Sequence, residues 1–268
     1  MDPRGPADVL GPTDAKSDLA VRSDPDVEDR SAVALPLEPP DVAFDERTIL
    51  LEEDFQSTTP AIEPFDTEEG FGGLGNFEDR RFYEMLVNDP SGTVAAPITR
   101  LDAGASEAIF VQAISFLSNF SGLSALDRGV YCWASNGNDP LAGARYELLY
   151  SPEGQIQLTR YDETGAPAAL LIDETWDAAA ANAADPDAPD SPDSATRIGM
   201  LCRPDDEGRA QIAVRIDRTY YVTTDGNGLR PGGGAGLVIA GRGSTASTDT
   251  IATFDSVFVL DGTQVPLR

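Results

Sequence analysis

Side chains with the chemistry of a sugar-binding surface gather near the middle of this sequence. Tyr131, Trp133 and Tyr146 supply rings on which the apolar C–H face of a pyranose can stack. Asn136 and Arg145 lie between them in the chain and carry groups that bind hydroxyls. The alternative is that the rings fill the interior of the domain, as aromatic side chains more often do. The sequence therefore predicts a ligand-binding group of five residues and leaves the exposure of its rings open.

The chain has only two cysteines, Cys132 and Cys202, and each lies in an apolar run, GVYCWAS and IGMLCRP. Two are too few for a structural zinc site, which needs four Cys or His ligands. Two buried free thiols are one interpretation. We favour a disulfide, because oxidised pairs are typical of extracytoplasmic domains. If that bond holds Cys132 in the interior, strand alternation turns Tyr131 and Trp133 outward.

Histidine is absent, and acidic residues dominate the charge. The lack of histidine excludes Ser-His-Asp and Cys-His nucleophile activation and every histidine-based metal site, although carboxylates can still act as general bases. The chain has 46 acidic and 19 basic residues, a net charge of −27, which repels phosphate backbones and anionic membranes. We therefore expect no nucleic-acid or lipid-surface partner, whereas cations, neutral sugars and basic partners remain compatible.

No stretch of the sequence approaches the roughly 20 apolar residues that a membrane helix needs, so no membrane-spanning segment is predicted. The opening residues, MDPRGPADVLGPTDAK, lack the basic start and apolar stretch of a secretory signal. The expectation is that the chain is cytoplasmic, or that a leader or anchor is not present in this chain.

Residues 1–47 differ in composition from the remainder. Seven prolines are spread among aspartates, with almost no aromatic residue. Such a segment buries too little apolar area to offset its ordering entropy, so we expect a linker or a partner-dependent arm. Only the run from Val33 to Leu37 is apolar enough to pack on a domain. The sequence predicts that residues 48–268 form that domain.

From Thr48 onward, short β-favouring runs alternate with turn-forming sequences. RGVYCWAS, ARYELLYS, QIQLTRYD and PAALLIDE are separated by Gly, Pro, Asn and Asp, which is typical of antiparallel β-structure. Pro152 and Gly154 favour a hairpin turn between Tyr150 and Gln155. AIFVQAISFLSNF fits neither period cleanly, and its β-branched and aromatic residues favour a strand. FDTEEGFGGLGNFEDRR is predicted to be a long loop, and residues 176–195 an acidic, low-complexity insertion.

The order of these runs resembles the concanavalin A-like lectin/glucanase jelly rolls, which include laminin-G-like domains and family 16 glycoside hydrolases. EEDFQS at residues 52–57 resembles their acidic-Phe opening strand, and the similarity continues through GVYCWA, YELLYSPEGQIQLTRYD and RIGMLCRPDDEGRAQIAVRIDRTYY. GGGAGLVIAGR followed by FDSVFVL at residues 254–260 resembles their glycine-rich and terminal strands. The resemblance implies an all-β fold, a two-sheet antiparallel jelly-roll sandwich, here with an extended N-terminal tail.

The resemblance also implies chemistry that can be checked residue by residue. Glycosidases of this superfamily carry Glu-x-Asp-x-x-Glu on one strand, because the hydrolysis needs two carboxylates at a fixed separation. The nearest match, EEDFQS, lacks the final acid and lies on the wrong strand, so catalysis is not expected. A structural calcium ion is often bound where the first and last strands meet, and the matching carboxylates are Glu53, Asp54 and Asp255. The alternative is that these carboxylates are only solvated.

The sequence best fits a non-catalytic recognition module located outside the cytoplasm or on a cell surface, with a glycan as the favoured ligand. A second hypothesis is a structural subunit of a surface or extracellular assembly, which contacts neighbouring protein subunits through its sandwich and tail. A glycoside hydrolase is the third and weakest.

Overall fold

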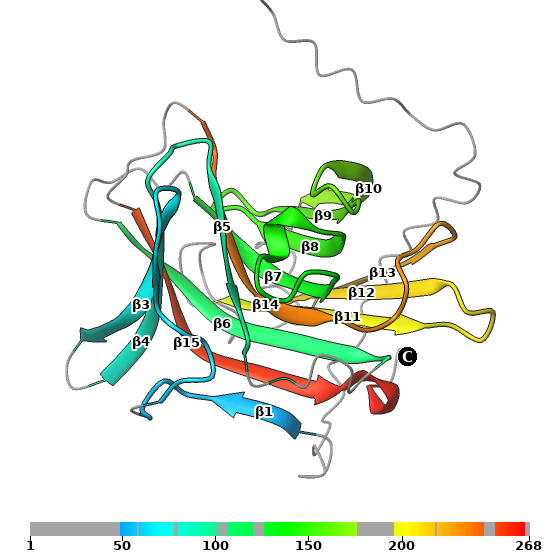
Figure 1. Ribbon diagram of the computed structural model, residues 1–268, viewed down its shortest axis with the longest axis horizontal. Helices are drawn as coiled ribbons and strands as arrows, with labels where there is room; N and C mark the ends of the chain where they lie inside the picture. The colour runs from blue at the N-terminus through cyan, green and yellow to red at the C-terminus, as the bar shows by residue number, and fades with distance from the viewer. Residues whose placement is uncertain are drawn as a thin grey trace, which may run out of the picture. The chain divides into compact units, whose positions relative to one another are not determined.

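The computed structural model describes residues 49–57, 59–77, 80–99, 101, 107–119, 126–175, 196–217, 219–243 and 250–265. The predicted tail, its boundary with the domain and the acidic insertion lie outside these ranges. Within them, fifteen strands form two antiparallel sheets. Figure 1 shows the two sheets packed face to face. The predicted two-sheet, antiparallel sandwich is confirmed. No helix among the described residues has the length and apolar character needed to cross a membrane.

The smaller sheet has six strands. In spatial order they are β10 (Pro167–Thr175), β9 (Gln155–Tyr161), β8 (Arg145–Tyr150), β7 (Leu126–Ala134), β14 (Gly234–Gly241) and β5 (Thr93–Pro97). Between β7 and β8 lies a short 3-10 helix, η2 (Pro140–Ala142).

The larger sheet has nine strands. Its spatial order is β13 (Thr219–Asp225), β12 (Ala210–Ile216), β11 (Thr196–Pro204), β6 (Ile109–Asn119), β15 (Thr250–Asp261), β4 (Arg80–Val87), β3 (Gly70–Phe77) and β2 (Phe65–Asp66). The first strand, β1 (Ile49–Glu53), pairs with the second half of β15, so the first and last strands meet as the resemblance implied. A second 3-10 helix, η3 (Gly262–Gln264), follows β15.

Local sequence signals identified most of these strands. The ambiguous AIFVQAISFLSNF run contains the long strand β6, which lies between β11 and β15 in the larger sheet. The predicted hairpin joins β8 to β9: Gly154 has φ of 87°, and the amide of Ser151 donates to the carbonyl of Gln155 at 2.9 Å. Both predictions are confirmed.

The glycine-rich stretch predicted to be a long loop contains β2 and β3, so that prediction is wrong. β3 pairs with β4 along its whole length, from Gly70 opposite Val87 to Phe77 opposite Arg80. Its glycines leave room for neighbouring side chains, since an added Cβ at Gly72 would meet the ring of Phe65. Here glycine marks close packing within a sheet rather than a turn.

Alternation along the strands places one face of each sheet in the shared core. The core includes Val130, Leu148 and Leu158 from the six-stranded sheet, and Val111, Met200 and Ile212 from the nine-stranded sheet. The predicted disulfide between Cys132 on β7 and Cys202 on β11 is confirmed, with a Cα–Cα distance of 6.5 Å, and it joins the two sheets through this core. The two cysteines are 70 positions apart in the chain. In the chain-entropy model, closing a loop of that length contributes about 4 kcal/mol to the free energy of unfolding.

Candidate functional site

The outer face of the six-stranded sheet can be assigned from the strand registers. Tyr146, Leu148 and Tyr150 on β8 belong to the core, so the alternate residues of this strand point outward. On β9, Ile156 and Leu158 belong to the core, and the alternate residues likewise point outward. The outward positions of these strands form rows across the sheet. This face divides into two halves that differ in what covers them.

The half formed by β5, β14 and β7 is covered. Tyr131 points away from the core cluster, yet its exposed fraction is only 1%, because it packs with Ala134 and Val238. The segment 135–144 between β7 and β8 lies beside this half. Its helix η2 contacts β5, and its Pro140 is buried. We call these three strands with their covering segment the covered half.

Arg145 holds this segment in place. Its Nη1 group donates to the carbonyl oxygens of Pro140, Leu141 and Gly143 at 3.4, 3.2 and 3.3 Å. Its Nε and Nη2 groups both bind the Oε2 atom of Glu147 at 2.8 Å. Both side chains are almost fully buried. The predicted hydroxyl-binding role of Arg145 is therefore replaced in this structure by a positioning role, since its donors are engaged inside the protein.

Tyr161 completes the buried group around Arg145. The Arg145 guanidinium lies 3.7 Å from the centre of the Tyr161 ring, and the Tyr161 hydroxyl donates to the Oε1 atom of Glu147 at 3.1 Å. Burial, followed by the charge of Glu147, raises the pKa of the Tyr161 phenol well above its ordinary value. Tyr161 therefore stays a neutral hydrogen-bond donor at physiological pH.

Asn136 is exposed but is also engaged locally. Its Oδ1 atom accepts hydrogen bonds from the backbone amides of Asn138 and Asp139, each at 3.2 Å. A side chain that bonds to the backbone two and three residues ahead stabilises a turn. Asn136 thus shapes the segment that covers the outer face.

Trp133 departs from the alternation on which its predicted exposure depended. Its φ of 52° lies in the left-handed region, which a bulky residue rarely occupies. The ring consequently joins the core that also contains Cys132, 5.9 Å from the ring of Tyr146, and only 2% of the residue is exposed. Tyr146 is buried too, and its hydroxyl donates to Asp225 at 3.1 Å. The exposed aromatic platform is not found at these residues, because Tyr131 is covered and the other two rings lie inside.

The other part of this face is open at β10, along β9 from Gln155 to Thr159, and at Leu149 on β8, whereas Arg145 and Glu147 on β8 are buried. The registers place Leu149, Gln157 and Asp173 in one outward row, Thr159 and Leu170 in the next, and Gln155 beside Thr175 in a third. Leu170 is 45% exposed. We call these seven residues the open face: Leu149, Gln155, Gln157, Thr159, Leu170, Asp173 and Thr175.

Hydrogen-bonding groups on the open face are only partly used. Gln155 donates to Asp173 at 3.0 Å and accepts from Arg242 at 3.1 Å. By contrast, no described residue is hydrogen-bonded to the side chains of Gln157, Thr159 or Thr175, and Gln157 and Thr159 stay partly exposed. One amide and two hydroxyls are therefore available to a ligand. The alternation Gln-x-Gln-x-Thr at residues 155–159 is the sequence signal that identifies this face, and the aromatic residues drew attention away from it.

The three carboxylates predicted to bind calcium do not form a common site. Glu53 is buried, and its two oxygens accept from the amides of Phe55 at 2.8 Å and Ala61 at 2.6 Å. Asp54 accepts from the amide of Gln56, and Asp255 pairs with Arg80 at 2.8 Å. No cluster of three or more His, Cys, Asp or Glu residues suited to a metal ion occurs in the described ranges. Local amides and an arginine engage these carboxylates in this structure, and a calcium site at them stays a prediction.

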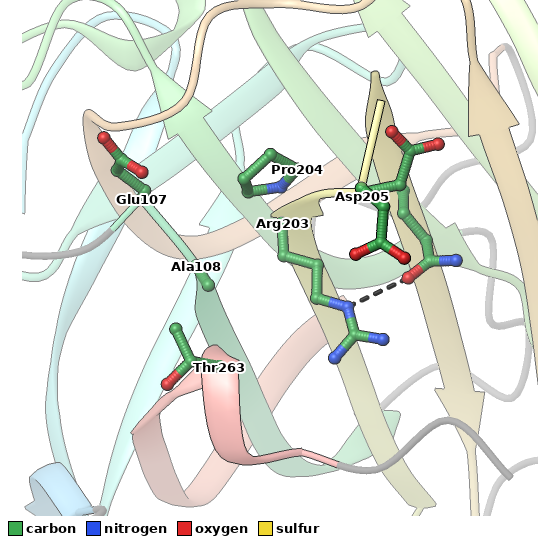
Figure 2. A pocket seen from close by; sticks show the side chains of 8 residues that line it. Glu107, Ala108, Arg203, Pro204, Asp205 and Thr263 are labelled. Carbon is green, nitrogen blue, oxygen red and sulfur yellow. Dashed lines mark hydrogen bonds between the residues drawn. The ribbon is translucent and has the colours of Figure 1, made fainter. Parts of the chain in front are cut away.

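A separate concavity of about 460 Å³ lies where β6, β11 and β12 approach η3 (Figure 2). It is lined by Glu107, Ala108, Arg203, Pro204, Asp205, Asp206, Gln211 and Thr263. In Figure 2, Arg203 projects between Thr263 and Asp205, and its Nε group donates to Gln211 at 2.9 Å. Asp205 accepts from the amides of Glu207 and Arg209 within its own turn. Its lining residues come from separate segments, and no sequence pattern predicted the concavity.

No protein-family model and no curated protein matches this sequence. Among solved structures, the Emp47p carbohydrate recognition domain has a TM-score of 0.46 and 12% identity, over 81% of this chain and 99% of that one. A legume lectin-like domain from Entamoeba histolytica has a TM-score of 0.40 and 10% identity, over 80% and 89%. The glycoside hydrolase family 43 protein BlXynB from Bacillus licheniformis has a TM-score of 0.44 and 11% identity, over 83% and 40%. At these values no site residue and no ligand is assigned from the likeness.

Proposed function

We propose that this chain is a non-catalytic recognition module that binds a neutral glycan on the open face. The observation that carries the proposal is the set of amide and hydroxyl side chains of Gln157, Thr159 and Thr175, which no described residue uses, beside the exposed Leu170. A sugar presents hydroxyls that both donate and accept hydrogen bonds, and it also presents an apolar C–H surface. Amides and hydroxyls next to an aliphatic side chain complement both features.

The charge of the open face favours a neutral ligand. The chain carries a net charge of −27, yet six of the seven open-face residues are uncharged. The one carboxylate, Asp173, accepts a hydrogen bond from Gln155. An ionic ligand would find no concentrated opposite charge here, whereas a polyhydroxylated ligand needs none. The rows run across three adjacent strands, about 10 Å in total, which suits a sugar chain better than a single atom or ion.

The proposal extends to location and to the absence of catalysis. The disulfide between Cys132 and Cys202 supports an oxidising, extracytoplasmic compartment. The sequence has no histidine and no complete Glu-x-Asp-x-x-Glu motif, which supports binding without hydrolysis. Incubation with each bound polysaccharide is expected to release no new reducing ends.

Glycan-array binding followed by calorimetry tests the ligand. Gln157→Ala and Thr159→Val should each weaken binding of the selected neutral glycan about tenfold, because each removes one or two hydrogen bonds to it. Thr224→Val is the matched control, since Thr224 is an exposed threonine on the edge strand β13 of the other sheet. Equal affinities for the wild type, both open-face variants and the control would rule out this face as the site.

A further inference from the structure

An apolar row crosses the outer face of the nine-stranded sheet. The registers place Ile49 opposite Leu260, Leu260 opposite Phe110, and Phe110 opposite Leu201. The row continues from Leu201 to Ala213 and from Ala213 to Val222. We call these six residues, one from each of six adjacent strands, the apolar row: Ile49, Leu260, Phe110, Leu201, Ala213 and Val222.

The apolar row is buried although it points away from the core. Phe110, Leu201, Ala213 and Leu260 form their own cluster, separate from the core, and none of them is more than 5% exposed. The described residues over its middle are Val265, which packs against the cluster, and η3, which contacts β6 and β11. Ile49 and Val222, at the two ends, are only partly buried. Outward side chains on a sheet become this inaccessible only where other protein atoms cover them, and this cover is less complete at Ile49 and Val222 than at the middle of the row.

Arginines flank the apolar row on both sides. On one side, the next outward row contains Arg203 on β11 opposite Gln211 on β12. On the other side, the next outward row contains Arg215 on β12 opposite Tyr220 on β13. Arg197 is exposed one row further out on β11. In a chain with only 19 basic residues against 46 acidic ones, this concentration of cations is local. Glu107, Asp205 and Asp206 line the same concavity as Arg203, so the cationic edge of the row is the edge with Arg215 and Arg197. An apolar occupant that carries acidic residues suits that edge.

We propose that residues 33–44 of this same chain dock along the apolar row. This segment, VALPLEPPDVAF, carries five large apolar side chains together with Glu38 and Asp41, and two more acids follow at Asp45 and Glu46. Its prolines favour an extended backbone without internal hydrogen bonds. It is the one part of the N-terminal region with the chemistry that the row and its flanking arginines require.

The reach of the chain permits this docking. The described chain begins at Ile49, which is itself the first member of the apolar row, so residues 33–44 connect to the row through only four residues. Six adjacent strands span roughly 24 Å between the outermost pair. Twelve extended residues cover roughly 40 Å, which is more than the row requires. The docked segment closes an apolar surface that would otherwise invite self-association, and this role is independent of glycan binding on the other sheet.

Photo-crosslinking in the full chain tests the contact. A benzophenone amino acid in place of Leu35 should cross-link, within the monomer, to peptides of β12, β13 or β15. The same probe in place of Leu10, outside the proposed segment, should not. The proposal is overturned if the Leu35 probe yields no such products, if the Leu10 probe yields the same ones, or if they form only between two copies or with an added protein.

A paired variant gives an independent readout. Leu35→Asp together with Leu37→Asp in the full chain should raise the fluorescence of a dye that binds apolar surfaces several-fold, or should shift the monomer towards self-association. Val9→Asp together with Leu10→Asp adds the same charges upstream and should change neither. Glycan affinity should be equal in all three proteins, so a failed glycan assay leaves this test unaffected. Unchanged dye binding and unchanged mass in the Leu35/Leu37 variant would refute the docking.

Discussion

The covered half and the open face belong to one surface of one sheet, yet they present opposite chemistry. On β7 and β14 the outward positions hold Tyr131 and Val238, and the segment 135–144 lies beside them. On β9 and β10 the outward positions of the open face hold glutamines, threonines, one aspartate and one exposed leucine. In both halves these outward residues alternate with core residues, such as Val130 on β7 and Leu158 on β9. The difference shows that an outward side chain becomes a binding group only where no other segment of the chain packs over it.

The largest expected effect comes from removing the side chain that holds the covering segment. Arg145→Ala leaves Glu147 buried without its cation and three carbonyl oxygens without their donor, so we expect a loss of about 3 to 5 kcal/mol of unfolding free energy. Urea denaturation measures the loss, and limited proteolysis should cut within residues 135–144 before the sandwich unfolds. Arg209→Ala removes an exposed, solvent-screened ion pair and should leave the urea midpoint nearly unchanged. Equal losses in the two variants would contradict the holding role of Arg145.

A smaller effect is expected where the covered half depends on close strand packing. An added methyl at Gly129 on β7 would collide with the carbonyl oxygen of Leu148 on β8. Gly129→Ala should therefore cost roughly 1 to 3 kcal/mol, measured as a shift of the urea midpoint. Gly137→Ala, in the covering segment, meets no atom within 4 Å and should be close to neutral. If Gly129→Ala left the urea midpoint unchanged, β7 and β8 would be able to move apart without a loss of stability.

The stability of the protein is expected to depend on pH through Asp127 on β7, the strand beside the border between the two halves. Burial raises the pKa of Asp127 to about 6, and this outweighs the opposing attraction of Arg242, 3.0 Å away. Because the folded-state pKa exceeds the ordinary value of about 4, the protonated form is favoured by folding. Its contribution to stability is complete below pH 4 and is lost as the pH rises through 6.

Asp127→Asn removes that titration and tests the direction of the shift. The variant should be more stable than the wild type by roughly 1 to 2 kcal/mol at pH 7.5, and the difference should shrink towards zero at pH 4. Thermal unfolding across this pH range measures both. A variant that is less stable than the wild type at pH 7.5 would show that the ion pair with Arg242 outweighs burial.

The smallest effect on stability is expected on the open face. Leu170→Ser changes an exposed side chain and should alter the unfolding free energy by about 0.5 kcal/mol or less. Under the proposed function it should nevertheless weaken glycan binding about fivefold, because the sugar loses its aliphatic contact. Leu50→Ser is the matched control, since Leu50 on β1 is 43% exposed on the other sheet. Identical glycan affinities for the two variants would remove Leu170 from the site.

The sequence by itself determined most of the strands, the hairpin at Pro152 and Gly154, and the disulfide. Each of these depends on short-range chemistry: a period of two, a residue that permits positive φ, and two cysteines in apolar runs. The five predicted ligand-binding residues were also chosen from a short stretch of sequence, and four of them lie in strands β7 and β8. The sequence left the exposure of Tyr131 and Trp133 open, and no local rule could have settled it.

Only the tertiary structure decided which outward positions are available. A period of two separates the two faces of a strand, but it does not say which face another segment covers. Tyr131 is covered because it packs with Ala134 and with Val238 from β14, and Trp133 is inside because one left-handed φ reverses the alternation. Glu53 and Asp255 are engaged because amides and an arginine from other segments reach them first. These outcomes depend on contacts between residues far apart in the chain, which composition and spacing do not encode.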